Sequence, residues 1–128
     1  MDRIAVLDAT AFMALLRGEA GADTVAGCLP WAVIGAVNQA EVLTKLVSAG
    51  MEEQVAWWHI AELKCESVPF DENQARIAGG LVKITRPYGL SLGDRACLAL
   101  AIQHRATVYT TDRVWSNLDL DIEVEVIR

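Results

Sequence analysis

Short apolar runs alternate with longer segments of helical periodicity along the whole chain. The runs expected to form strands cover residues 3–7, 31–35, 65–70, 107–110 and 122–127. The segments expected to form helices cover residues 9–17, 22–28, 38–49 and 52–63, then a helix that Asp71 caps, then residues 96–102. Gly18 and Gly50 each follow one of these helices and favour its termination there. Strands that alternate with helices predict a parallel sheet covered by helices on both faces.

The margins of this sheet can also be predicted. Pro69 lies near the end of the third strand run, and proline is confined to margins because it cannot donate a ladder hydrogen bond. The last strand run alternates apolar residues with acids, at positions 119, 121, 123 and 125. This alternation is typical of a strand with one solvated face. Both runs therefore indicate strands near the sheet margins.

The composition fits a single domain spanning residues 1–128. Of the 128 residues, 53% are hydrophobic, and a domain of this size buries roughly two-thirds of its unfolded surface. No apolar stretch approaches the roughly 20 residues that a membrane helix requires, and the first residues lack the pattern of a secretory signal. Cys28, Cys65 and Cys97 are far apart in apolar surroundings, as small buried side chains in a reducing compartment would be. We therefore expect a cytoplasmic protein without a membrane segment.

Four acidic residues stand where an apolar run ends or a helix begins: Asp8, Glu41, Asp94 and Asp112. The carboxyl ends of parallel strands meet at one edge of a sheet, where such folds bind their ligands. Carboxylates gathered there repel one another, by about 4 kcal/mol for a pair roughly 4 Å apart at an effective dielectric of about 20. The cluster therefore requires raised pKa values or a bound cation. Oxygen donors of this kind suit Mg²⁺ or Mn²⁺.

Each acid also has a purely structural explanation. Asp8 and Asp112 can each cap the helix or turn that follows. Ser91 and Asp94 resemble a capping box, and Glu41 can form an ion pair along its own helix. The alternative to a catalytic site is therefore a non-catalytic interaction module whose acids are helix caps.

The net charge is −6, from 17 acids and 11 bases. An acidic balance generally argues against a nucleic-acid partner, because affinity for nucleic acids comes mainly from neutralising phosphates. Four basic residues nevertheless lie near two of the acids in sequence: Lys83, Arg86, Arg95 and Arg113. These are the expected phosphate contacts if a nucleic acid binds. The structural alternative is that they pair with nearby carboxylates.

Four motifs contain the acids. In chain order they are Asp8-Ala9-Thr10, Val37-Asn38-Gln39-Ala40-Glu41-Val42, the segment LSLGDRACLALA at residues 90–101, and Tyr109-Thr110-Thr111-Asp112-Arg113. The third motif is long and specific, whereas the first alone would be weak. Together they resemble the successive motifs of PIN-domain ribonucleases, and most closely those of the VapC toxins of bacterial toxin–antitoxin pairs. The resemblance covers essentially the whole chain and includes all four acids.

The resemblance implies a PIN-like three-layer α/β/α fold with a central parallel sheet of about five strands. It implies an endoribonuclease that uses Mg²⁺, or Mn²⁺ as a substitute, to hydrolyse phosphodiester bonds in structured RNA such as tRNA or rRNA. A metal-activated water would be the nucleophile. The four acids would be the catalytic metal ligands, supported by Thr10, Asn38 and Thr111. The implied partners are RNA, a small antitoxin protein that blocks the site, and a second copy of the chain in a homodimer.

Overall fold

In the computed structural model, which describes residues 4–128, five parallel strands form one sheet in the order β3-β2-β1-β4-β5. The strands are β1 (Ala5–Leu7), β2 (Ala32–Gly35), β3 (Glu66–Val68), β4 (Thr107–Thr110) and β5 (Glu123–Val126). The centre of the sheet is β1, which pairs with β2 on one side and β4 on the other. The predicted margin strands, β3 and β5, do occupy the two margins.

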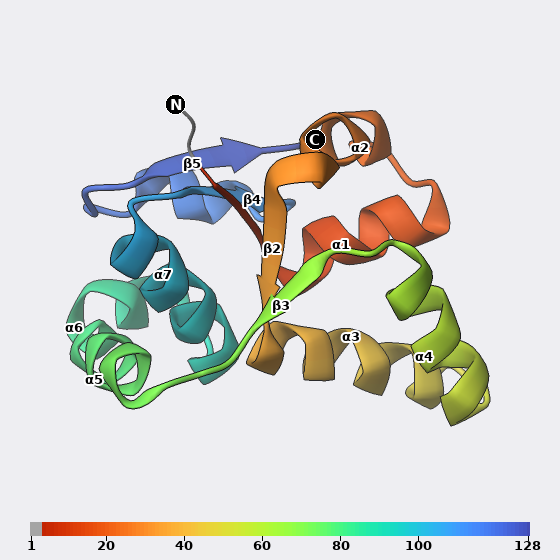
Figure 1. Cartoon of the computed structure of the whole chain (residues 1–128). Helices are drawn as coiled ribbons and strands as arrows, with labels where there is room; N and C mark the ends of the chain where they lie inside the picture. Colours follow the sequence, from red (N-terminus) through yellow and green to blue (C-terminus); the bar gives the residue numbers. More distant parts are fainter. Residues whose placement is uncertain (1–3) are drawn as a thin grey trace.

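Helices cover both faces of this sheet, so the predicted three-layer α/β/α architecture is confirmed (Figure 1). One layer contains α1 (Ala9–Arg17), α2 (Ala22–Cys28), α3 (Ala36–Ser48) and α4 (Glu53–Glu62). The other contains α5 (Glu72–Gly80), α6 (Val82–Thr85) and α7 (Leu92–His104). Three short 3₁₀ helices, η1 (Leu29–Trp31), η2 (Arg86–Tyr88) and η3 (Arg113–Asn117), complete the chain.

The alternation of side chains along β1 explains why two separate cores form. Ala5 and Leu7 pack with the first helical layer, whereas Val6 between them packs with α7 and Trp115. On the second side, α7 is buried along most of its length, including every residue from Ala96 to Ala101. The expectation of a central buried helix is therefore confirmed.

Several predicted boundaries shift by one to four residues for identifiable reasons. The largest shift is at α7, which starts at Leu92 rather than at residue 96 because Ser91 caps it. Trp31 ends η1, so β2 begins one residue later than predicted. Gly35 takes the extended N-cap conformation of α3, so this helix starts at Ala36 rather than at Asn38. β3 stops before Pro69, and α5 ends at the Gly79-Gly80 pair.

The start predicted for the first strand, Arg3, lies outside the described residues. No helix within residues 4–128 is both long enough and apolar enough to cross a bilayer.

Candidate active site

Asp8 follows the central strand, and its carboxylate is buried, with 3% of the residue exposed. Its Oδ1 accepts hydrogen bonds from the Ala11 amide at 2.8 Å and the Thr10 hydroxyl at 2.7 Å. Its Oδ2 accepts a hydrogen bond from the Thr110 hydroxyl at 2.5 Å. The pKa of Asp8 is raised above its ordinary value, mainly by burial and to a smaller extent by the charge of Asp94. The hydrogen bonds to its carboxylate oppose this shift. The carboxylate is therefore costly to ionise and firmly oriented.

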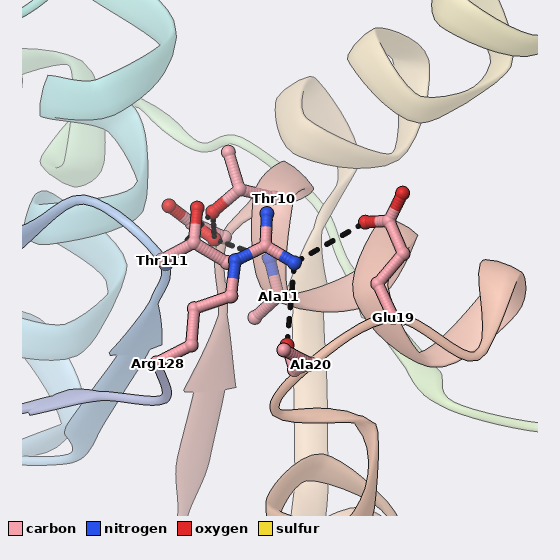
Figure 2. Close-up of polar contacts among 7 residues, drawn as sticks. Thr10, Ala11, Glu19, Ala20, Thr111 and Arg128 are labelled. Atoms are coloured by element: carbon pink, nitrogen blue, oxygen red, sulfur yellow. Dashed lines mark hydrogen bonds and ion pairs between the residues drawn. The ribbon is translucent and has the colours of Figure 1, made fainter.

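Two threonines tie the carboxyl end of β1 to that of β4. The Thr110 hydroxyl that donates to Asp8 also accepts a hydrogen bond from the Asp112 amide at 3.0 Å. The Thr111 amide donates to the Thr10 hydroxyl at 3.0 Å, a contact drawn in Figure 2. These bonds place Asp112 at the same edge as Asp8, although its own exposed carboxylate accepts a hydrogen bond from the Val114 amide at 3.0 Å.

Glu41 reaches the site from α3, where it is held by Asn38. The buried Asn38 side chain donates to Glu41 Oε1 at 2.8 Å and to the Gly93 carbonyl at 3.1 Å. The Glu41 carboxylate lies against Gly93. A Cβ added to Gly93 would be only 2.7 Å from the Glu41 carboxyl carbon. Glycine at position 93 therefore makes room for Glu41 beside the start of α7.

Asp94 forms the predicted capping box with Ser91. Its Oδ2 accepts a hydrogen bond from the Ser91 amide at 2.9 Å, and its own amide donates to Ser91 Oγ at 3.1 Å. The side chain is half-buried in the first turn of α7. Capping therefore fixes the backbone that carries Asp94.

Cys97 lies on α7 one turn after Asp94 and is fully buried near the acids. Burial raises the pKa of its thiol well above the ordinary value, and the charges of Asp8, Asp94 and Glu41 raise it further. The contacts give the same neighbourhood: Glu41 lies against Gly93, the residue before Asp94, and Thr110 bonds both Asp8 and the Asp112 amide. The structure thus brings Asp8, Glu41 and Asp94 together, with Asp112 at the rim.

A profile of the PIN domain matches residues 5–120, a span that contains all four motifs. The chain belongs to the PIN-domain family. Comparison with curated protein sequences gave no significant match.

The fold of this PIN domain is similar to those of several solved proteins. VapBC-5 from Mycobacterium tuberculosis, a member of a family of toxin–antitoxin systems, matches at 26% identity and a TM-score of 0.64, with 99% of each chain covered. VapBC from Salmonella typhimurium, solved bound to DNA, matches at 12% identity and a TM-score of 0.76, with 97% of this chain and 98% of that chain covered. VapBC2 from Rickettsia felis, bound to a promoter DNA fragment, matches at 15% identity and a TM-score of 0.75, with 95% and 97% covered. The resemblance predicted from the four motifs is therefore confirmed in family and fold.

The donor set of this PIN domain suits a hard divalent cation, although its side chains are not arranged as ready-made ligands. No group of three His, Cys, Asp or Glu side chains within residues 4–128 is positioned to hold a metal ion. All four acids present carboxylate oxygens, the ligands that Mg²⁺ and Mn²⁺ prefer. Glu41 Oε2 and Asp94 Oδ1 accept no hydrogen bond from the part of the chain that the structure describes. Both oxygens are therefore available to a cation.

The four basic residues predicted as phosphate contacts have different surroundings. Lys83 on α6 and Arg86 on η2 are exposed, as is Arg113 at the start of η3. Arg95 is instead half-buried, and its Nη1 donates to the Ala78 carbonyl of α5 at 2.9 Å. The guanidinium of Arg95 therefore joins α7 to α5, which does not favour its predicted role as a phosphate contact.

Three residues that contribute to the geometry were not predicted from the sequence: Thr110, Gly93 and Cys97. Thr110 could have been found from strand alternation, because it shares its side of β4 with the buried Val108. The need for glycine at position 93 depends on a contact with α3, and no local pattern reveals it.

Proposed function

We propose that this PIN domain is a metal-dependent endoribonuclease and the toxin of a toxin–antitoxin pair. The observation that supports this function best is the placement of the acids in a chain of this family: the buried Asp8 carboxylate shares Thr110 with the Asp112 amide, and Glu41 lies against Gly93, next to Asp94. The similarity to solved VapBC proteins supports the toxin assignment. Structured RNA, such as tRNA or rRNA, is the proposed substrate.

In this proposal the four acids hold Mg²⁺ or Mn²⁺. Asp8 would be the fixed ligand, because three hydrogen bonds orient its carboxylate. Glu41 and Asp94 would complete the set by rotating their side chains toward Asp8. Thr10 and Asn38 orient two of these carboxylates, and the Thr111 amide holds the Thr10 hydroxyl in place. When bound, the cation supplies Lewis-acid stabilisation of the phosphate and lowers the pKa of the attacking water.

No side chain of the site is a suitable nucleophile. The raised pKa of Cys97 keeps its thiol protonated, and the residue is fully buried. His59 lies on α4 and His104 at the far end of α7, away from Asp94 at the start of that helix. Water is therefore the proposed nucleophile.

The alternative, an interaction module with acids as caps, has support in the structure. Asp8, Asp94 and Asp112 each accept a hydrogen bond from a backbone amide at the start of a helix. Capping alone does not require a carboxylate, because Asn or Ser caps equally well. It also leaves the burial of Asp8 and the contact between Glu41 and Gly93 without a reason. Cleavage assays on the amide variants described in the Discussion separate the two functions.

The proposed protein partners require an accessible apolar surface, and α4 provides one. This helix buries Ala56 and Ile60 but leaves Val55, Trp57 and Trp58 exposed by 44%, 47% and 58%. Large aromatic side chains are enriched at protein interfaces and are seldom exposed together without a partner. This surface supports an antitoxin partner, and homodimerisation remains a prediction.

Metal binding should raise the melting temperature of the protein and should be required for RNA cleavage. At 100 times the dissociation constant, a ligand that binds only the folded state adds about 2.7 kcal/mol to the free energy of unfolding. For a domain of this size that raises the melting temperature by on the order of 10 °C. Thermal melts with and without Mg²⁺ or Mn²⁺ measure this shift, and EDTA should abolish cleavage of RNA. Undiminished cleavage in excess chelator would exclude the metal mechanism.

Lys83 and Arg86 should contribute RNA affinity without affecting metal binding. Each phosphate contact on single-stranded nucleic acid contributes roughly 0.7 to the slope of log affinity against log salt. The double variant Lys83→Ala, Arg86→Ala should therefore bind RNA more weakly and lower this slope by about 1.4. The measurement is a salt titration of RNA binding, and the Mg²⁺-induced shift in melting temperature serves as the control. A slope equal to that of the parent protein would place the RNA elsewhere.

A further inference from the structure

Arg128, two residues after the end of β5, lies at the same sheet edge as the acids. The Ile127 amide donates to the Thr110 carbonyl at 2.9 Å, which continues the pairing of β4 with β5 past the ends of both strands. Extending this register places Arg128 beside Asp112. Arg113 Nε also donates to the main-chain oxygen of Arg128 at 3.1 Å. The backbone of Arg128 is therefore fixed next to the fourth motif.

The side chain of Arg128 connects this edge to the turn between α1 and α2. Its Nη1 donates to Glu19 Oε1 at 3.3 Å and to the Ala20 carbonyl at 3.2 Å. In the view of Figure 2, the side chain runs past Thr111 toward Glu19, in front of the segment that carries Thr10. Because its backbone is fixed beside the fourth motif, Arg128 brings a guanidinium to the margin of the site on the side of Asp112.

The contact with Glu19 is weak enough to exchange. The two side chains are 38% and 39% exposed, and exposed ion pairs stabilise a protein very little because water and salt screen them. Both hydrogen bonds use Nη1, and no hydrogen bond within residues 4–128 engages the other two guanidinium nitrogens. Arginine can form a stronger, forked contact with a phosphate. An RNA phosphate could therefore displace Glu19.

A phosphate backbone that approaches four carboxylates also requires nearby positive charge. Because the net charge of the chain is −6, the positive charge must come from basic residues next to the site. Arg113 and Arg128 supply it on the β5 side of Asp112, held together by the bond between Arg113 and the Arg128 main chain. We propose that Arg128 binds a phosphate of the RNA substrate beside the acids, and that Glu19 is its counter-ion in the free protein. This inference rests on the proposed ribonuclease function.

Unfractionated tRNA is a suitable probe. Binding is measured by fluorescence anisotropy against salt concentration in Mg²⁺, with all variants built on Asp8→Asn so that the RNA stays intact. Arg128→Ala should weaken binding roughly tenfold and lower the salt slope by about 0.7 to 0.9. Glu19→Gln should tighten binding about twofold to fivefold, and this gain should vanish when Arg128→Ala is also present. In the cleaving protein, Arg128→Ala should raise KM more than it lowers kcat.

Arg105→Asn is the matched control. Arg105 is exposed and lies before β4, at the opposite end of that strand from Thr110. Its backbone is left-handed, with φ of 52°, a conformation that Asn tolerates well. This substitution removes the same charge as Arg128→Ala but does so at the opposite end of β4 from the acids. It should therefore lower tRNA affinity and the salt slope much less than Arg128→Ala does.

Two results would overturn the inference while leaving the ribonuclease function standing. In the first, the parent protein cleaves RNA, but Arg128→Ala and Arg105→Asn have the same tRNA affinity and the same salt slope. The other is weaker binding by Glu19→Gln, which would show that Glu19 supports the RNA rather than competing with it. If the parent protein neither binds nor cleaves any RNA, the proposed function fails and the inference fails with it. Thermal melts confirm that each variant is folded.

Discussion

Replacing Asp8 by Asn should abolish RNA cleavage while the protein remains folded. Asn caps a helix as well as Asp does, so the bond to the Ala11 amide can persist. The substitution also removes a buried charge whose ionisation burial opposes, so the metal-free protein should be at least as stable as its parent. The catalytic loss should be much larger. Changing groups that merely orient metal ligands already costs about 10–100-fold, so loss of a ligand should cost at least about 100-fold.

The measurements are the initial rate of RNA cleavage and the melting temperature of the metal-free protein. Asp94→Asn, Asp112→Asn and Glu41→Gln should behave in the same way. Asp121→Asn is the control, because Asp121 is exposed just before β5 and far from Thr110 at the other end of the neighbouring strand. If Asp8→Asn, Asp94→Asn and Asp112→Asn each lose about 1 kcal/mol of stability, the usual cost of a lost cap, and still cleave RNA, the capping function alone is correct.

Gly93→Ala should lower activity without lowering stability. The added Cβ would collide with the Glu41 carboxylate, which is the end of a flexible side chain and can swing away at little cost. Gly93 stands in the first turn of α7 and does not have a positive φ, so alanine fits its backbone. The fold should therefore tolerate the change, while Glu41 leaves its position and cleavage falls by roughly 10–100-fold.

Gly79→Ala provides a matched control within α5, because a Cβ at that position meets nothing within 4 Å. It should leave cleavage unchanged. In a Glu41→Gln background, Gly93→Ala should cause little additional loss, since both changes act on one carboxylate. An additive loss would instead mean that Gly93 acts on the site through the α7 backbone, and the assigned role of its contact with Glu41 would be wrong.

The positions of the acids were predictable because chain direction alone sends the ends of parallel strands to one edge. Asp8 and Asp112 follow runs that were predicted to form strands, and both do lie at that edge. The capping box of Ser91 and Asp94 is local, so the sequence shows it directly. The full strand order was beyond what the sequence could predict, because alternation of strands and helices is compatible with several orders.

Contacts between distant segments were the part that the sequence could not show. Asn38 was assigned to the site by resemblance, but its bond to the Gly93 carbonyl joins residues 55 positions apart. Arg95 follows an acid and was predicted to face RNA, yet the packing of α7 on α5 directs its guanidinium to Ala78. Such choices depend on which helix faces which, and periodicity within one helix does not determine this.

Under the proposed function, Asp8, Asp94 and Asp112 both bind metal and cap helices, and this double role has a genetic consequence. A carboxylate that only bound metal could be lost with its surroundings, whereas these side chains also start α1, α7 and η3. Under the proposed function, aspartate-to-asparagine changes would yield a silent toxin with an intact surface for its antitoxin. Such an allele would sequester antitoxin from a functional copy of the gene and raise its toxicity, although the allele itself cleaves nothing.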